Sequence, residues 1–178
     1  MKFWLGQNII NNYQPIAISN LVLAIGFLKM PKSHMKEFNP KMHTAEHILN
    51  QTMIQLFKTG RCFSAHIEDK KSKCDYHFDR ALSETELKDL EDKINEIINL
   101  DLPVQESFLP KEEAMRLYNL ERLPEGTEGD LRIIKVGDYD AVPCVGPHVQ
   151  STKEIGQFKL ISSDFNDGVL RIRYKLVS

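Results

Sequence analysis

Between residues 41 and 58 the apolar positions recur every three or four residues, which is the spacing of one buried face on an α-helix. These positions are Met42, Ala45, Ile48, Leu49, Met53 and Leu56. Gly60 follows and can end the helix. A second apolar stripe follows Ser83 and runs to about Leu100, and Glu86 lies three residues after Ser83, the spacing of a capping box. The pattern predicts two longer amphipathic helices.

The remaining pattern predicts strands. The expected strands are 62–67, 73–79, 103–109, 131–136, 139–143, 154–163 and 168–177, with a short helix over 110–118. Gly137-Asp138 and Asn166-Asp167-Gly168 are turn sequences that predict hairpins. In the last strand, apolar residues from Leu170 to Leu176 alternate with basic ones, as in a half-buried antiparallel strand. The fold class expected is α+β, an antiparallel sheet with two longer helices packed against it.

Residues 1–34 form a separate N-terminal extension in this prediction, and residues 35–178 form the domain. The run 16–28 is strongly apolar, but it is shorter than the roughly 20 residues that span a bilayer and contains Ser19 and Asn20. Three interpretations stay open: an extension with little structure or a misassigned start, an added helix, and a membrane or export signal. No membrane contact is expected for the domain itself.

Composition narrows the class of protein. The chain has 178 residues and a net charge of −2, so it has no general basic field, and any nucleic-acid contact must use a local patch. Its three cysteines, Cys62, Cys74 and Cys144, are irregularly spaced, which favours a reducing, cytoplasmic location over a disulfide framework. A chain of this length buries a core without a metal. A metal site therefore indicates a function.

Four residues have the chemistry and spacing of zinc ligands. His43 and His47 are four apart on the first predicted helix, so both rings project from one side and can reach one cation. A metalloprotease helix would carry Glu directly after the first His, where this chain has Thr44. Cys144 and His148 flank a Val-Gly-Pro turn that can bring thiolate and imidazole together. Together they supply the tetrahedral number of donors and predict one Zn²⁺ site between the first helix and a C-terminal turn. The alternative is two polar helix residues, a buried Cys and a surface His.

Three segments resemble a known family. They are His43-Thr-Ala-Glu-His47-Ile-Leu, Cys144-Val-Gly-Pro-His148-Val, and Thr152 to Leu160. This combination resembles the second additional, or editing, domain of threonyl- and alanyl-tRNA synthetases and the free-standing alanyl-tRNA editing proteins of the AlaX type. The resemblance covers about residues 40–177.

The resemblance implies a trans-acting aminoacyl-tRNA hydrolase that deacylates mischarged tRNA at its acceptor end. The expected substrate is seryl-tRNA charged on the tRNA for alanine, with the tRNA for threonine less favoured. His43 and His47 are expected to be catalytic as well as metal-binding. Ser64 is expected to hydrogen-bond the seryl hydroxyl, with His66 as a second candidate; a plain surface serine is the alternative. Whether the zinc is catalytic or structural stays open, since four protein ligands close its shell.

Two features depart from the family pattern or add to it. The turn between Cys144 and His148 is more like that of the threonyl-tRNA synthetase branch of the family. That branch has an acidic residue two positions before the Cys, where this chain has Val142, and the nearest acid is Asp140. For tRNA contact, two basic groups are candidates, with solvated charge as the alternative: Arg171, Arg173 and Lys175 on the last strand, and Lys70, Lys71 and Lys73 in a turn. Competing functions are a hydrolase of another aminoacyl ester and a non-catalytic zinc-containing RNA- or protein-binding module.

Overall fold

The computed structural model of the chain describes residues 39–118, 120, 126 and 128–177. All of them belong to one compact unit, Lys36–Ser178. The expected N-terminal extension, residues 1–34, lies outside the described residues, so its three interpretations and its boundary stay predictions.

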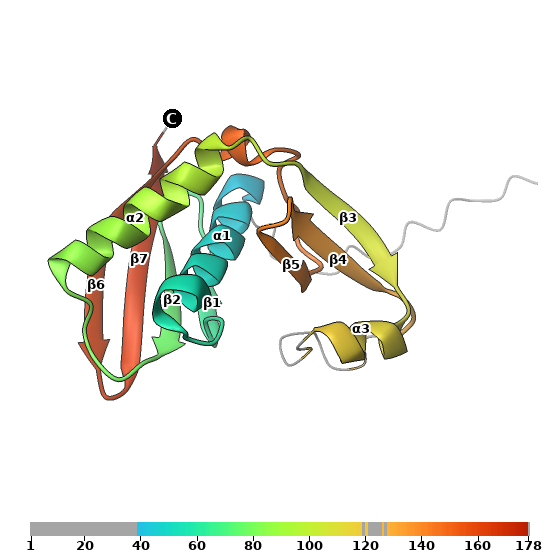
Figure 1. Cartoon of the computed structure of the whole chain (residues 1–178), viewed down its shortest axis with the longest axis horizontal. Helices are drawn as coiled ribbons and strands as arrows, with labels where there is room; N and C mark the ends of the chain where they lie inside the picture. The colour runs from blue at the N-terminus through green and yellow to red at the C-terminus, as the bar shows by residue number, and fades with distance from the viewer. Residues whose placement is uncertain (1–38, 119, 121–125, 127, 178) are drawn as a thin grey trace, which may run out of the picture. The chain divides into compact units, whose positions relative to one another are not determined.

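A four-stranded antiparallel sheet forms the larger half of the unit. Its strand order is β1-β2-β7-β6. The strands are β1 (Ser64–His66), β2 (Ser72–His77), β6 (Gln157–Asn166) and β7 (Val169–Val177). Two helices, α1 (Pro40–Phe57) and α2 (Glu84–Asn99), lie on one face of this sheet (Figure 1). On β7, Leu170, Ile172 and Tyr174 are fully buried, so the predicted alternation is confirmed.

Helix α1 carries the core face that its sequence predicts. The Asn39 side chain accepts hydrogen bonds from the backbone N–H groups of Lys41 and Met42, and Pro40 occupies the first turn, where its missing N–H costs nothing. Five of the expected apolar positions are fully buried: Met42, Ala45, Ile48, Leu49 and Met53. Leu56 is 43% exposed, so its prediction as a core residue is wrong. It lies in the last turn, before Lys58 ends the helix in the left-handed conformation.

Helix α2 begins as predicted. The Ser83 hydroxyl accepts from the backbone N–H of Glu86, and the Glu86 carboxylate accepts from the backbone N–H of Ser83. Leu90, Ile94, Ile97 and Ile98 are buried along one side. Both expected helices therefore form around their apolar stripes.

A second sheet corrects the prediction of a single one. It contains β3 (Val104–Leu109), β4 (Leu131–Val136) and β5 (Asp140–Pro143), in that order and all antiparallel, next to a third helix, α3 (Lys111–Leu117). After β5 the chain turns through residues 144–151 into a 3-10 helix, η1 (Thr152–Ile155), so β6 begins at Gln157 rather than at 154. Hydrophobic alternation predicts strands but not their partners, and β4 pairs with β3 instead of joining the larger sheet.

Among the described residues, no helix combines the length and the apolar character needed to cross a membrane.

Candidate metal centre

Helix α1 and the turn after β5 bring His43, His47, Cys144 and His148 together. Their ligand atoms all lie within 4.8 Å of one another. The Cys144 Sγ lies 3.5 Å from His43 Nε2 and 3.4 Å from His148 Nε2. In a zinc tetrahedron with Zn–S about 2.3 Å and Zn–N about 2.0–2.1 Å, a sulfur and a nitrogen lie about 3.5 Å apart. The spacing of the donor atoms therefore fits one zinc ion.

Oxygen atoms hold two of these imidazoles from behind. His43 Nδ1 lies 3.2 Å from the Pro147 carbonyl oxygen, which can only accept, so Nδ1–H donates and Nε2 faces the cluster. His148 Nδ1 lies 3.1 Å from the Thr44 hydroxyl oxygen. That hydroxyl donates to the Pro40 carbonyl at 2.8 Å, so it must accept from His148. Metal-binding histidines are oriented in this way, with the second ring nitrogen donating to an oxygen.

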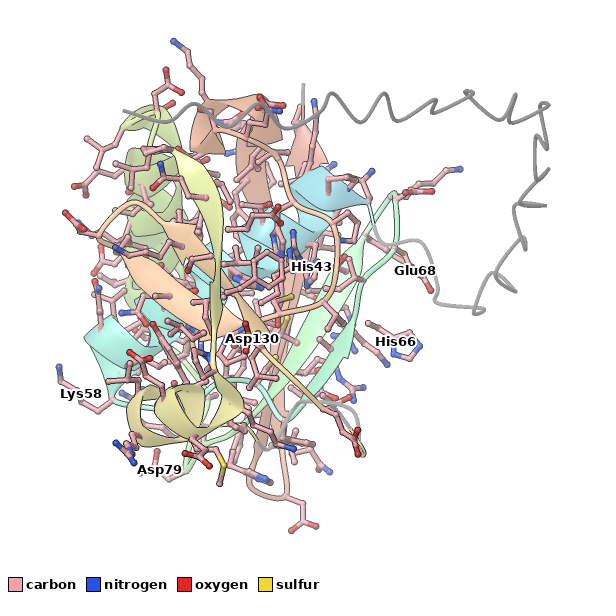
Figure 2. The ribbon with its side chains drawn as sticks, turned by 90° about the vertical axis from the view of Figure 1, so that its right-hand side faces the viewer. His43, Lys58, His66, Glu68, Asp79 and Asp130 are labelled. Carbon is pink, nitrogen blue, oxygen red and sulfur yellow. The ribbon has the colours of Figure 1, made fainter. Side chains whose placement is uncertain are left out.

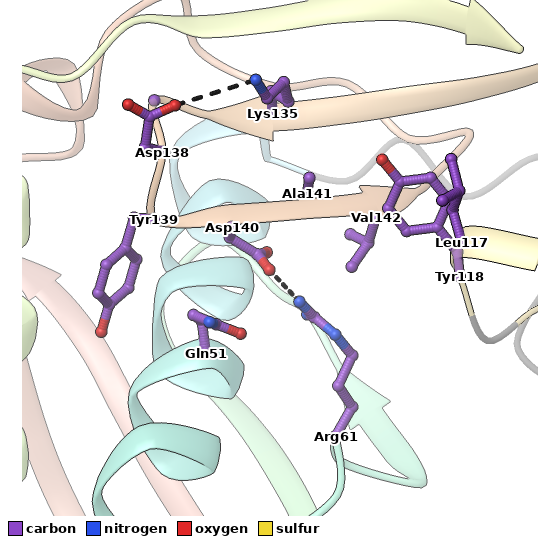
Figure 3. Close-up of a pocket in the computed structure, with 11 residues that line it drawn as sticks. Gln51, Arg61, Leu117, Tyr118, Lys135, Asp138, Tyr139, Asp140, Ala141 and Val142 are labelled. Carbon is purple, nitrogen blue, oxygen red and sulfur yellow. Dashed lines mark hydrogen bonds and ion pairs between the residues drawn. The ribbon is translucent and has the colours of Figure 1, made fainter. Parts of the chain in front are cut away.

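The third imidazole lies beside a buried carboxylate. His47 Nδ1 is 3.6 Å from Asp140 Oδ2, slightly longer than a hydrogen bond, and Asp140 Oδ1 accepts from Arg61 (Figure 3). Burial raises the pKa of Asp140, although the charge of Arg61 acts in the opposite direction. Asp140 thus lies between His47 and Arg61. The sequence analysis noted this acid near Cys144 but predicted no partner for it.

A polar cavity adjoins Asp140. It has a volume of about 400 Å³ and lies between α1, the β4–β5 hairpin and the end of α3 (Figure 3). Gln51, Arg61, Lys135, Tyr118 and Tyr139 contribute polar groups to its wall. Asp138 and Asp140 also line the cavity, and they pair with Lys135 and Arg61. The hydrogen-bonding groups of this wall can accommodate the hydroxyl groups of a ribose.

The turn after β5 is built for close approach to α1. A Cβ atom on Gly146 would lie 2.2 Å from His43 Cε1, so only glycine allows this packing. Arg132 on β4 donates to the Cys144 carbonyl at 3.2 Å and to the Gly146 carbonyl at 2.7 Å, and its Nε donates to Glu106 at 2.6 Å. Arg132 therefore fixes the turn from the side of the second sheet.

The charge state of the cluster also suits a metal. Burial, followed by the neighbouring His47 and His43, lowers the pKa of His148 to about 2. Neutral imidazole is the form that binds metals. His43 and His47 are buried, whereas Cys144 and His148 are partly exposed. The donor set, its spacing and its supporting oxygens fit Zn²⁺, and the binding of zinc by these four residues stays a prediction.

Ser64 and His66 lie elsewhere. In the β1–β2 register Ser64 is opposite Asp75 and His66 is opposite Lys73, so these residues share the sheet face turned away from the buried Cys74. Figure 2 shows His66 projecting from the outer surface, apart from His43. Ser64 is half-buried and His66 is exposed. Their role in recognising a substrate hydroxyl stays a prediction.

The expected basic groups are partly neutralised by acids. Arg171 pairs with Asp75 through two hydrogen bonds of 2.6 and 2.7 Å, and Arg173 pairs with Asp164 at 3.0 Å. The turn with the three lysines also contains Glu68 and Asp69. Lys175 is exposed on β7. The basic strand face is therefore less positive than its sequence suggests.

Four residues support the cluster in ways that the sequence analysis did not predict. Thr44 was considered only as the absence of a protease glutamate, and Gly146 only as part of a tight turn. Asp140 was noted without a partner, and Arg132 gave no signal. Thr44 and Gly146 act through contacts between α1 and the turn after β5, which are far apart in the sequence. Arg132 acts through the backbone carbonyls of that turn, which no side-chain motif reveals.

Comparisons with known proteins cover the segment with Cys144 and His148 and identify relatives over most of the chain. Residues 131–173 match the family model described as the threonyl and alanyl tRNA synthetase second additional domain. The chain is 31% identical over 140 residues to an alanine–tRNA ligase of Methanopyrus kandleri, covering 74% of this chain and 15% of that protein. It is 31% identical over 133 residues to an alanine–tRNA ligase of Treponema denticola, and this match covers 74% of this chain and 22% of that protein. It is also 30% identical over 159 residues to an alanine–tRNA ligase of Caldicellulosiruptor saccharolyticus, and this match covers 88% of this chain and 18% of that protein.

The chain spans less than a quarter of the length of each of these curated relatives. The matched segment contains β4, β5, the turn with Cys144 and His148, and most of β7. The family expected from the two motifs is therefore confirmed, and this chain carries a domain of the threonyl- and alanyl-tRNA synthetase second additional type.

Proposed function

We propose that this domain is an aminoacyl-tRNA deacylase that acts in trans on mischarged tRNA, with seryl-tRNA for alanine as its first substrate and that for threonine as its second. One observation carries the proposal: the His43/His47 and Cys144/His148 motifs, which resemble those of editing domains, converge on one partly exposed cluster. The similarity to alanine–tRNA ligases supports a tRNA substrate.

The proposed reaction is hydrolysis of an activated ester. The oxygen of water adds to the ester carbonyl carbon and the bond to the ribose oxygen breaks, which releases the amino acid and the uncharged tRNA. Such an ester requires mainly positioning of the water and of the terminal ribose. The polar cavity beside Asp140 is the proposed place for the ribose, since the side chains of Gln51 and Arg61 lie on its wall and can hydrogen-bond its hydroxyl groups.

His43, His47, Cys144 and His148 are the proposed zinc ligands. A bound Zn²⁺ would supply a positive charge at the partly exposed end of the cluster and would orient the polar end of the aminoacyl group. The protein contributes the rigidity of the site: the Pro147 carbonyl, the Thr44 hydroxyl and Asp140 limit the movement of the three rings.

The test is deacylation by the purified 178-residue chain. Seryl-, glycyl-, alanyl- and threonyl-tRNA are supplied in turn, and release of the amino acid is followed. We expect hydrolysis of seryl-tRNA for alanine above that of alanyl-tRNA. His47→Ala should abolish it, whereas His77→Ala, at an exposed histidine on β2, should leave it unchanged. No hydrolysis of any charged tRNA by zinc-loaded protein would contradict the proposal.

Amino-acid recognition is tested separately. If the Ser64 hydroxyl binds the seryl side chain, Ser64→Ala lowers hydrolysis of seryl-tRNA more than that of glycyl-tRNA. An unchanged ratio would remove Ser64 from the site, in keeping with its place on the outer face of the sheet.

A non-catalytic zinc-containing binding module is the second candidate. One observation favours it: four protein donors fill a tetrahedral shell, as in structural zinc sites. It predicts binding of tRNA or of a protein without turnover. Hydrolysis of an aminoacyl ester other than that of tRNA is the remaining alternative, and small aminoacyl esters in the same assay distinguish it.

A further inference from the structure

A second group of donors lies next to the first along α1. Glu46, one residue before His47, directs its carboxylate toward the thiols of Cys62 and Cys74, and the ligand atoms of the three residues all lie within 4.8 Å of one another. Glu46 is 2% exposed and both cysteines are fully buried. The three residues come from α1, from the segment before β1 and from β2.

The carboxylate and the first thiol are held in place by a single amide. Asn50, one turn after Glu46 on α1, donates to Glu46 Oε1 at 2.7 Å, and its own oxygen accepts from the Cys62 backbone N–H at 2.8 Å. The Cys62 Sγ then lies 3.3 Å from Glu46 Oε1. Asn50 therefore fixes helix and loop relative to each other, as residues behind metal ligands do.

A buried hydroxyl adds an independent indication. The Tyr76 hydroxyl is fully buried and has no hydrogen-bond partner among the described residues. Burial raises the pKa of Tyr76 well above its usual value, and Cys74, Cys62 and Glu46 are the next causes in order. Buried hydroxyl groups are normally hydrogen-bonded. Because all three residues influence Tyr76 electrostatically, its hydroxyl lies in the same part of the core as the donor group.

We propose that Glu46, Cys62 and Cys74 form a second metal site, which takes one thiophilic divalent cation, with Zn²⁺ as the first candidate. Two sulfurs and a carboxylate oxygen are zinc donors, and a sulfur and an oxygen around a tetrahedral zinc lie about 3.5 Å apart, close to the 3.3 Å observed. The three donors fill three of the four positions of a zinc tetrahedron. The ion would join α1 to β2 inside the core, and the proposed role is therefore structural. Without an ion, Cys62 simply donates a hydrogen bond to Glu46.

Metal content distinguishes these two states. The full chain, loaded with Zn²⁺ and freed of excess, should contain two zinc ions per chain. Cys74→Ser should lower the content to one, and Cys144→Ser, in the first cluster, should also lower it to one. A native content of one that Cys144→Ser removes, or a native content of two that Cys74→Ser leaves unchanged, would overturn the proposal.

A second measurement does not require any change in the buried core. In Co²⁺-loaded protein, the charge-transfer absorption reports thiolate ligands, and the described residues contain three cysteines, none of which is in a disulfide. Cys144→Ser should keep about two-thirds of the native absorption, because Cys62 and Cys74 still bind the ion. Loss of the whole band in Cys144→Ser would show that the buried thiols bind no metal.

Discussion

Two adjacent residues of α1 point into two different donor clusters. His47 belongs to the partly exposed cluster of three histidines and Cys144, whereas Glu46 belongs to the fully buried cluster with Cys62 and Cys74. The first cluster is supported by a backbone carbonyl, a hydroxyl and a carboxylate, and the second by one amide. A substrate can reach the first cluster because Cys144 and His148 are partly exposed, whereas the second cluster is buried. The difference in exposure therefore separates a candidate reactive site from a candidate structural site.

The largest effect is expected from Gly146→Ala. The new methyl group would overlap His43 Cε1 and Nδ1, at 2.2 and 2.5 Å, and would displace the ring from Cys144. We expect the zinc affinity of the first cluster to fall by about 100-fold or more, while the second cluster keeps its ion. Chelator competition measures this affinity.

Gly60→Ala is the matched control, since a Cβ there would meet nothing within 4 Å. Equal zinc affinities for the two variants would contradict the close contact of the turn with His43.

Asp140→Asn should have the next largest effect. It removes the carboxylate beside His47 and the partner of Arg61, so the ring is less well oriented. The expected loss of zinc affinity in the first cluster is about 10- to 100-fold. Asp138→Asn, at a fully exposed position of the same hairpin, should leave the affinity unchanged. If Asp140→Asn binds zinc like the native chain, Asp140 has no orienting role.

Thr44→Val tests the hydroxyl behind His148. It leaves His148 Nδ1 and the Val149 backbone N–H without their acceptor, so zinc affinity should fall about 10-fold. The free energy of unfolding should fall by about 1–3 kcal/mol, as measured by urea titration.

Thr44→Ser should keep most of the native zinc affinity and free energy of unfolding, because serine retains the hydroxyl oxygen that accepts from His148 and Val149. Thr59→Val should cost little, because the buried Thr59 hydroxyl has no hydrogen-bond partner among the described residues. A Thr44→Ser variant as weak as Thr44→Val would show that the methyl group, not the hydroxyl, matters.

The smallest effect concerns α2, whose cap lies outside both clusters. The Arg80 guanidinium, and then the backbone N–H of Ser83, lower the pKa of Glu86 from 4.5 to about 2. Since the folded-state pKa is the lower one, Glu86 stabilises the fold above about pH 4.5, and this contribution is lost as the pH falls to about 2. Glu86→Gln should therefore be less stable than the native chain at pH 7, with a difference that closes in acid.

The urea midpoints of both chains at pH 7 and near pH 2 test this prediction. A difference that does not change with pH would mean that the charge of Glu86 is not what stabilises the cap.

Local features of the fold could be predicted from the sequence. The buried face of α1, the capping box at Ser83 and the hairpin at Asp167-Gly168 were predicted because each depends on neighbouring residues. The division into two sheets was missed because strand alternation does not name a partner strand. Leu56 was misplaced because the helical period continues past the point where the core ends.

The same division applies to the donor clusters. The i, i+4 spacing of His43 and His47 and the Gly-Pro turn between Cys144 and His148 were evident, and the structure brings both pairs together. The group of Glu46, Cys62 and Cys74 has no regular spacing, so no motif could reveal it. Asp140 likewise could not be assigned to His47 before the β4–β5 hairpin was placed next to α1.

By itself, the sequence determined which side of α1 carries the two histidines, where both long helices form and which family the domain resembles. Those properties follow from spacing along the chain. Only the tertiary structure decided that Thr44 supports His148, that Gly146 must lack a side chain and that Glu46 faces two thiols. The physical reason is that these contacts join segments far apart in the sequence, and only the packing of the core brings them within bonding distance.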